Sequence, residues 1–363
     1  MSLTRRKNRR KNAGRAYTNE NVYSEEALMK DIGIKKYLSP GIALLLIAPI
    51  VGELLSGHQT LFDFINPLQF ILSALPYGFG AIICRELKVR WGKGWFCLVL
   101  LGIVFGIYEE AIVARSFWDP NWSELGALRD YSYWKGVVWV YAELLVHFHL
   151  TISIISSVVL VEILYFDRRH QPWVSRWGFG ACLVGLALWM PPLIVLNPFM
   201  PPLVGYILSW MTMIGLTYAA WRLPARIFRP RPGTTMRPLG YGIVAAVNTT
   251  LVFVSVFVLP EMGLPWMPPW PVLFVFLAVL DALTFWMIMR WSGNGTRWDD
   301  RHKLAMVIGL LSFFIFFDGL KDIFEQPFSG LSLVAVVASW SLWQLWIRTQ
   351  ARCLEGSCQA LGS

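Results

Sequence analysis

The sequence predicts an all-α protein, a polytopic transmembrane helix bundle of about ten spans with both termini inside the cell. Three observations predict it. Of the 363 residues, 56% are hydrophobic and only 15% are charged, whereas soluble domains carry about 25% charged residues. The apolar residues recur in blocks of roughly 18 to 25, the length that crosses a bilayer core. Lys and Arg are confined to short clusters between these blocks.

The predicted spans follow each other along most of the chain, and Pro or Gly residues mark most of the joins. Residues 1–39 are predicted to form a basic cytoplasmic arm, residues 40–350 the transmembrane domain and residues 351–363 a cytoplasmic tail. The spans are expected at residues 40–57, 67–84, 95–117, 135–165, 178–196, 201–221, 239–260, 270–290, 304–320 and 330–347.

Basic residues alternate between the joins. Clusters such as Arg85–Lys93 and Arg290–Lys303 fall in the even-numbered joins, while the odd joins 57–66, 197–202 and 261–269 contain no Lys or Arg. The positive-inside rule therefore places the even joins and both termini in the cytoplasm. We expect the partners to be the lipid bilayer and anionic headgroups on its cytoplasmic side. The net charge of +9 does not indicate nucleic acid, because no nucleic-acid-binding motif is present.

Ionisable side chains inside the predicted spans are the first candidates for function. Each costs several kcal/mol in hydrocarbon unless it is paired, neutralised or hydrated. Most of them are acids or histidines rather than basic residues. They are Glu53, Glu109, Glu110, Arg115, Glu143, His147, His149, Asp281 and Asp318.

The third span carries the strongest local pattern. Gly102, Gly106 and Glu109 share one helix face, and small residues four apart let a second helix approach closely. Glu109 is thereby expected to face a helix interface. Glu110 is turned by about 100°, so the two carboxylates can address one point only if the helix distorts.

The fourth span carries two polar stripes, one with Glu143 and His147 and the other with His149 and Ser153. The two histidines are about 200° apart, so at most one faces a given site. A membrane histidine can equally be a hydrogen-bonded packing residue. At about 1.5 Å per residue, Glu53, Glu109, Glu110 and Glu143 lie at a similar depth, toward the outer face, and are expected to share one site.

Several stretches within about residues 40–165 resemble a family of uncharacterised bacterial multi-span membrane proteins. The resemblance implies residence in the bacterial cytoplasmic membrane and no agreed activity. The stretches are Ala48–Gly57, Tyr77–Ala81, Cys84–Leu87, Trp91–Trp95, Gly106–Ala111, Trp118–Trp122, His149 and Leu160–Glu162.

The Glu109-Glu110 pair, followed by a histidine in the next span, is also similar to the CAAX protease and bacteriocin-processing (CPBP) family of intramembrane peptidases. That resemblance implies Glu109 or Glu110 as the base, His149 as a ligand or oxyanion donor, and a divalent metal ion as the candidate cofactor. The sequence departs from the family pattern in three ways. No Phe precedes His147 or His149 by four positions, as the motif FxxxH requires. Arg115 falls one residue later than in the motif EExxxR, and the third element, HxxxN/D, is missing.

Three classes of function fit these residues. The first is a Glu/His-dependent peptidase that uses Glu109, Glu110 and His149. The second is a proton- or cation-coupled transporter whose substrate- or ion-binding residues are Glu53, Glu143, His147, Asp281 and Asp318, in addition to the Glu pair. The third is a scaffold in which the acids only fix helix packing, for example through an Asp318–Lys321 pair.

Overall fold

The computed structural model describes residues 38–324 and 327–354. The chain divides into two compact units, residues 1–40 and 41–363. Of the first unit only residues 38–40 are described, so the predicted basic arm lies almost wholly outside the described residues. The same holds for the tail beyond Leu354. Everything below concerns the second unit.

The described residues are mainly helical, and most of the segments labelled η are π-helical turns inside longer helices; only η5 is a 3₁₀ turn. The elements, in order, are α3 (Pro40–Pro49), η1 (Ile50–Leu54), α4 (Leu61–Ile65), α5 (Pro67–Ser73), η2 (Ala74–Gly78), α6 (Phe79–Arg90), α7 (Trp95–Ile107), η3 (Tyr108–Val113), α8 (Leu128–Ser132), β1 (Tyr133–Trp134), β2 (Val137–Val138), α9 (Trp139–Phe148), η4 (His149–Ser156), α10 (Ser157–Leu164), η5 (Phe166–Arg168), α11 (Arg176–Leu196), α12 (Leu203–Arg222), α13 (Pro238–Phe253), η6 (Val254–Val258), α14 (Leu259–Glu261), α15 (Trp270–Trp291), α16 (Asp300–Phe324) and α17 (Leu331–Leu354).

Within the described residues, nine helices are long and apolar enough to cross a membrane. The segment predicted as the first span, Pro40–Leu54, is apolar but shorter. The multi-span all-α prediction is therefore confirmed, while the count of ten and the inside position of the termini stay predictions. Several boundaries differ by a few residues: the fourth span begins at Trp139 rather than at residue 135, and the second ends at Arg90 rather than at residue 84. The antiparallel pair β1 and β2 turns at Lys135 and Gly136, both of which have positive φ.

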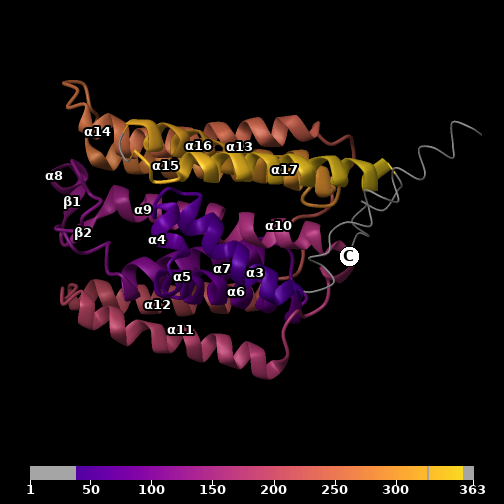
Figure 1. Ribbon diagram of the computed structural model, residues 1–363, viewed down its shortest axis with the longest axis horizontal. Coiled ribbons are helices and arrows are strands. Elements are labelled where there is room, and N and C mark those ends of the chain that lie inside the picture. Colours follow the sequence, from indigo (N-terminus) through magenta and orange to yellow (C-terminus); the bar gives the residue numbers. More distant parts are fainter. Residues whose placement is uncertain (1–37, 325–326, 355–363) are drawn as a thin grey trace, which may run out of the picture. The chain divides into compact units, whose positions relative to one another are not determined.

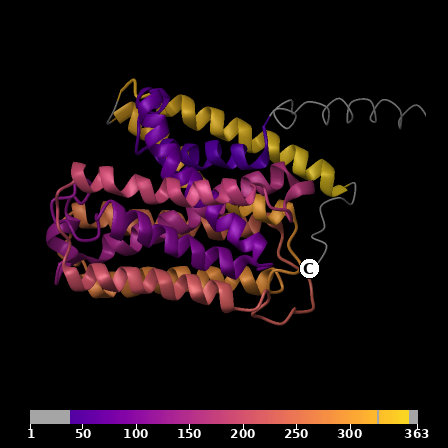
Figure 2. The same ribbon diagram turned by 90° about the horizontal axis from the view of Figure 1, so that it is seen from below.

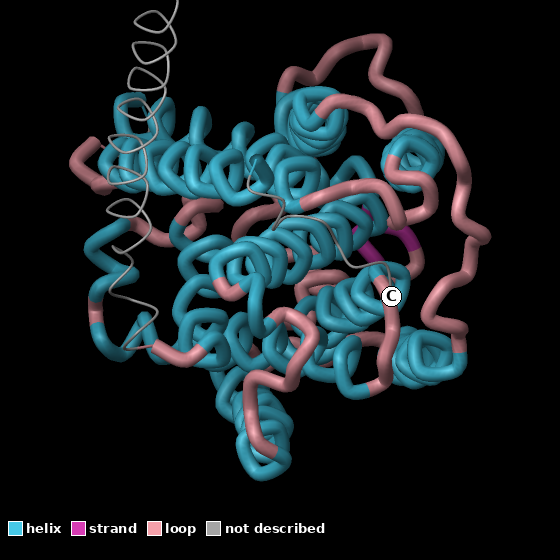
Figure 3. The backbone as a smooth tube through the Cα atoms, turned by 90° about the vertical axis from the view of Figure 1, so that its right-hand side faces the viewer, coloured by secondary structure: helices cyan, strands magenta, loops and turns pink. Residues whose placement is uncertain are grey.

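The long helices of this unit run side by side (Figures 1 and 2). The middle layer contains α6, α7, α9 and α10; α11 and α12 cover one face of it, and α13, α15, α16 and α17 lie over the other (Figure 1). Packing pairs α7 with α12, α6 with α11, and α13 with α16. The fourth span, α9 to α10, packs against α7 within the middle layer and against α15 and α16 of one outer layer. Figure 3 shows the bundle end on, with most helices seen along their axes.

The loops separate into two groups, one at each end of the bundle. Loops predicted to be cytoplasmic contact each other: Lys93 Nζ donates to the Leu223 carbonyl, and Arg169 forms an ion pair with Asp300. We call this the basic end. At the opposite end, which carries β1, β2 and α8 (Figure 1), Leu61 N–H donates to the Ser329 carbonyl. The predicted alternation of loops along the chain therefore corresponds to an alternation in space.

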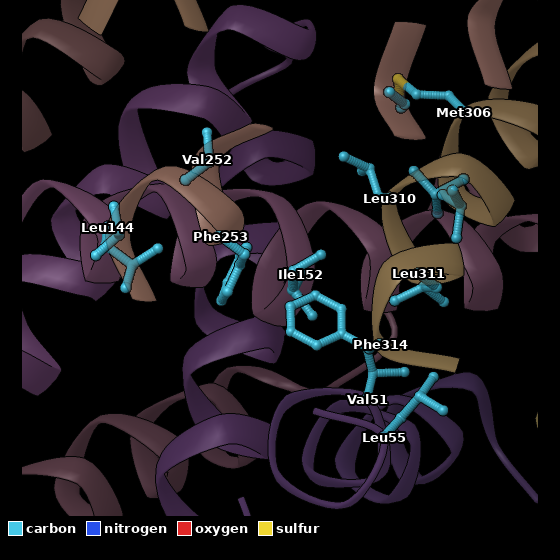
Figure 4. Close-up of a cluster of buried hydrophobic side chains, with 14 of the residues drawn as sticks. Val51, Leu55, Leu144, Ile152, Val252, Phe253, Met306, Leu310, Leu311 and Phe314 are labelled. Carbon is cyan, nitrogen blue, oxygen red and sulfur yellow. The ribbon is translucent and has the colours of Figure 1, made fainter. Parts of the chain in front are cut away.

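The main hydrophobic core joins the segments that carry the candidate site. Val51 and Leu55 flank Glu53 in the chain, and they meet Ile152 of η4 and Phe314 of α16 (Figure 4). Phe253 of α13 packs edge to face against Phe314, with ring centroids 4.8 Å apart. Burial of such large side chains removes apolar surface from solvent and fixes the helices against each other. The polar side chains between them are held by this packing.

The predicted close approach of helices at Gly102 and Gly106 is present. A Cβ atom at Gly106 would lie 3.2 Å from the Val146 Cα and 3.3 Å from the His149 Cβ, both on the fourth span. A Cβ atom at Gly102 would meet Leu150 in the same way. The two glycines therefore set the distance between the helix that carries Glu110 and the helix that carries His149.

Replacement of Gly106 by leucine is expected to destabilise the protein by about 1–3 kcal/mol, because the backbone of the fourth span cannot move away without repacking. The measurement is reversible unfolding in mixed detergent micelles. Gly215→Leu is the matched control, because no atom lies within 4 Å of a Cβ atom at Gly215 in the described structure. Equal losses for the two variants would contradict the close-packing argument.

Candidate functional site

Three carboxylates and one histidine from different helices gather in one place, which we call the acidic cluster: Glu53, Glu109, Glu110 and His149. Glu109 interacts electrostatically with both Glu110 and Glu53. Tyr77 lies among them, with its hydroxyl close to Glu53. The structure thus brings together Glu109, Glu110 and His149, to which the CPBP resemblance assigned catalysis. Glu53 lies with them, as expected from its depth, and Tyr77 is an addition.

A continuous chain of hydrogen bonds runs through the cluster. Ser116 Oγ donates to Glu110 Oε2 at 2.5 Å, and Glu110 Oε1 lies 2.7 Å from His149 Nε2. On the other side of the ring, His149 Nδ1 is 3.2 Å from Ser153 Oγ. The His149 residue is fully buried, with 0% exposure. Every ring nitrogen and carboxylate oxygen of the pair is therefore engaged with another side chain.

Each member of the cluster comes from a π-helical turn. Glu53 lies in η1, Tyr77 in η2, the two glutamates in η3, and His149 in η4. In η3 the Ala114 N–H donates to the Glu109 carbonyl five residues earlier, as a π turn requires. Such a turn changes the rotation between successive side chains. The distortion that was needed for Glu109 and Glu110 to face one site is therefore present.

Local sequence explains part of this distortion. Pro49 immediately precedes η1 and Pro76 lies inside η2, and proline lacks the N–H that an α-helical turn requires. Gly52 matters for a different reason. A Cβ atom there would lie 2.5 Å from the Tyr77 ring and 3.4 Å from Ser153 Oγ. Only glycine lets η1 approach η2 and η4 closely enough to place Glu53 in the cluster.

Aromatic side chains surround the histidine. The ring centroids of Tyr77, Phe105 and Phe148 lie 5.8, 5.5 and 5.3 Å from that of His149. These rings leave little access for water on the fourth-span side of the cluster. A polar pair in such a low-dielectric setting interacts more strongly than it would in water.

The acidic cluster is accessible to water on the side that faces the end of the bundle opposite the basic end. Gln59 Nε2 donates to Glu53 Oε2 at 3.2 Å, and His58 Nε2 lies 3.9 Å from the same oxygen. His58 Nδ1 is 3.2 Å from Glu124 Oε1, and these two side chains are 49% and 38% exposed. The sequence did not indicate His58 and Glu124, because they lie in joins between the predicted spans, where polar residues are ordinary. Ser116 lies within the predicted third span, but a serine there is not ionisable and gives no comparable signal.

Glu143 and His147 belong to a second group, which we call the midspan cluster: Glu143, His147, Asn248 and Asp281. His147 Nδ1 is 2.9 Å from Asp281 Oδ2, and Asn248 Nδ2 donates to Asp281 Oδ1 at 2.9 Å. Glu143 interacts electrostatically with Asp281. The expectation that Glu143 shares one site with Glu53, Glu109 and Glu110 is therefore wrong. Its helix face points to α15 and not to η3.

The alternative pairing proposed for Asp318 is also absent. Lys321 Nζ donates to the Gly57 carbonyl at 2.7 Å. Asp318 is fully buried beside Gly57, and within the described part of the chain neither of its carboxylate oxygens has a hydrogen-bond partner. Lys321, three residues after Asp318 on the same helix, thus binds the carbonyl of another segment instead of the Asp318 carboxylate.

Arg115 does not approach the carboxylates. It follows the end of η3 with a positive φ of 66°, and its guanidinium donates to the Phe199 carbonyl at 2.8 Å and to the Asn197 carbonyl. Arg115 therefore binds the carbonyls that follow α11, where a cation complements the helix dipole. The same reversal of the chain places Ser116 against Glu110.

Charged residues at the basic end form a separate network. Glu162 forms ion pairs with Lys88 at 2.7 Å and with Arg85 at 3.8 Å. Arg90 binds Glu86. Together with Arg169, Asp300 and Lys303, these ion pairs tie α6, α10 and α16 to the loop after η5.

No metal centre emerges from this geometry. Among residues 38–324 and 327–354, no group of three or more His, Cys, Asp or Glu side chains is placed to hold a metal ion. The described side chains thus do not fit the divalent ion that the peptidase resemblance implied.

Comparison with known families gives a match over most of the second unit. The model of one family, described as an uncharacterized membrane protein family, matches residues 42–354. The chain belongs to this family. The match extends well beyond residues 40–165, where the resemblance was first visible, and it covers both clusters. No curated protein and no solved structure matches the chain.

The protein is expected to lose stability as pH rises above neutrality because of His58. Burial opposes protonation of His58, but the carboxylates of Glu53, Glu124 and Glu110 outweigh burial and the charge of Lys321, and they raise its pKa above the ordinary value of 6.5. A raised folded-state pKa contributes stability that is complete below about pH 6.5 and is lost as pH rises through the folded value.

Thermal unfolding of the wild type and of His58→Gln between pH 5.5 and 8.5 measures this contribution. The variant should lose part of the stabilisation at low pH and match the wild type at high pH. His170→Gln is the control, because burial and Arg169 lower the pKa of His170 and its contribution has the opposite sign. An unchanged pH profile in His58→Gln would count against the assigned ion pairs.

Proposed function

We propose that the protein is a proton-coupled transporter of the bacterial cytoplasmic membrane, with the acidic cluster as its proton-binding centre. The observation that carries this proposal is the hydrogen-bonded chain Ser116–Glu110–His149–Ser153. Glutamate and histidine both exchange protons in the physiological range when their surroundings are adjusted. Chains of such groups in membrane spans are typical of proton relays in pumps and transporters.

The remaining acids support the same function. Glu109 Oε2 and both oxygens of Asp318 are buried, and the described residues offer them no hydrogen-bond partner. An uncompensated carboxylate in this setting would be costly, so each group either carries a proton or holds a cation. A transporter uses groups of this kind, whereas a scaffold would be more stable with apolar residues in their place.

The two ends of the bundle differ as alternating access requires. His58 and Glu124 connect the acidic cluster to water at the opposite end, while the network of Arg85, Glu86 and Glu162 closes the basic end. If the basic end lies in the cytoplasm, the end with His58 and Glu124 faces outward, and protons enter the acidic cluster from outside. Inward release would then need the ion pairs of the basic end to separate.

A second candidate function, an intramembrane Glu/His-dependent peptidase related to the CPBP family, is favoured by one observation. The 2.7 Å contact between Glu110 and His149 joins the two residue types that such a site needs. Glu110 would be the base for an attacking water and His149 would stabilise the oxyanion. Against it, both oxygens of Glu110 and both nitrogens of His149 already have protein partners.

Glu110→Gln and His149→Gln should each lower proton flux into proteoliposomes by about a hundredfold, because each removes a proton-transferring group. Flux is measured with an enclosed pH-sensitive dye while a potassium diffusion potential drives protons inward. Asp63→Asn, which changes an exposed acid near the same end of the bundle, is the control and should keep wild-type flux.

Folding of each variant is checked by its thermal unfolding curve. If the two variants retain full flux, the transport proposal is overturned. Cleavage of membrane-embedded peptides by the wild type, abolished in Glu110→Gln with no proton flux in either, would establish the peptidase instead. If the well-folded wild type shows neither proton flux nor peptide cleavage, the scaffold function remains.

A further inference from the structure

The midspan cluster has the geometry of a poised base. Asp281 receives hydrogen bonds on both oxygens, one from Asn248 and one from His147 Nδ1. A carboxylate that accepts from Nδ1–H fixes the tautomer of the ring and leaves Nε2 with a free lone pair. His147 is 3% exposed, and its Nε2 has no hydrogen-bond partner among the described residues.

A second unpartnered atom lies on the same helix face. Glu143 is one helical turn from His147, so the two side chains are neighbours on α9. Glu143 Oε2 is likewise buried without a partner in the described part of the chain. The free atoms on this face of α9 are thus one basic nitrogen and one carboxylate oxygen.

The charges around this place are out of balance. Glu143 and Asp281 are its two acids. The elements α7, η6 and β2 also pack against α9 and contain no Lys, Arg, Asp or Glu, and neither does α13, which carries Asn248. The charged residues of α8, which packs against α9 as well, are Arg129 and Asp130, and both are exposed. On α15 the other charged residue is Arg290, in its last turn. The other histidine nearby, His149, is engaged with Glu110 in the acidic cluster. Two acids without a cation are unfavourable in hydrocarbon. Asp281 is nevertheless 34% exposed on its side chain, so the site is not sealed.

We propose that the midspan cluster is a second proton-binding site, in which the proton binds His147 Nε2 between Asp281 and Glu143. The imidazolium that forms carries the one positive charge that the two carboxylates lack. The proposal adds a second site to the proposed transport function. It depends on that function only for where the bound proton goes next. Proton binding itself is tested without any transport.

The site is separate from the acidic cluster but connected to it by the chain. His147 lies in the last turn of α9 and His149 begins η4, so the two rings leave the fourth span on different sides within two residues. Thr151 Oγ1 also donates to the His147 carbonyl, at the junction of the two helix types. A proton bound at one ring therefore acts on the helix turn that positions the other.

The test follows the ring nitrogens of the full-length protein in lipid nanodiscs by ¹⁵N NMR, with histidine labelled and His147 assigned by its absence in His147→Gln. As the pH rises from 5 to 8, the His147 Nε2 signal is expected to change from a protonated to an unprotonated position. Glu143→Gln and Asp281→Asn should each move the midpoint by about one pH unit, because each removes a carboxylate next to the imidazolium.

Asp63→Asn, which changes an exposed acid outside both clusters, is the control and should leave the His147 midpoint in place. A His147 signal that does not change over this range, or a midpoint indifferent to both Glu143 and Asp281, would overturn the proposal. The wild-type titration alone decides the first point, even if a variant fails to fold. Loss of flux in Glu110→Gln with a silent His147 would refute this site and leave the transport proposal standing.

Discussion

The structure depends on one constraint: a charge in hydrocarbon must find a partner or lose its charge. The fourth span carries Glu143, His147, His149 and Glu162, and each of them interacts with an ionisable residue on another segment. Because these interactions point to different neighbours, they hold the fourth span in the centre of the bundle. The apolar packing around Phe253 and Phe314 then closes the same helices over the polar groups.

The π-helical turns are the second requirement. In a regular α-helix, Glu109 and Glu110 would diverge by about 100°, and His147 and His149 by about 200°. The π turn at η3 lets both glutamates face the acidic cluster, whereas the divergence of the two histidines already places them in different clusters. Gly52 and Gly106 allow the backbones to approach closely enough for these side chains to meet. Because of the π turns and the glycines, the helices lie close enough for side chains of ordinary length to reach each other.

The bundle is asymmetric along its axis in a way that fits its proposed use. At one end, exposed His58 and Glu124 bring water to the edge of the acidic cluster. At the other end, strong ion pairs such as Arg169–Asp300 join segments far apart in the sequence. Between them lie two groups of titratable residues on two sides of one helix. Separate proton sites of this kind would let binding on one side influence the other through the helix they share.

The sequence by itself determined the all-α membrane architecture and the grouping of basic loops, because hydropathy and loop charge are local properties that the bilayer reads directly. It also singled out the helix contact at Gly102 and Gly106, since small residues four apart share one face. Only the tertiary structure decided which acid meets which histidine. Glu143 interacts with Asp281, Lys321 with the Gly57 carbonyl and Arg115 with the carbonyls after α11. Helix rotation, π turns and neighbouring segments determine these pairings. None of these can be read from the sequence of one span, because each depends on a segment far away in the chain.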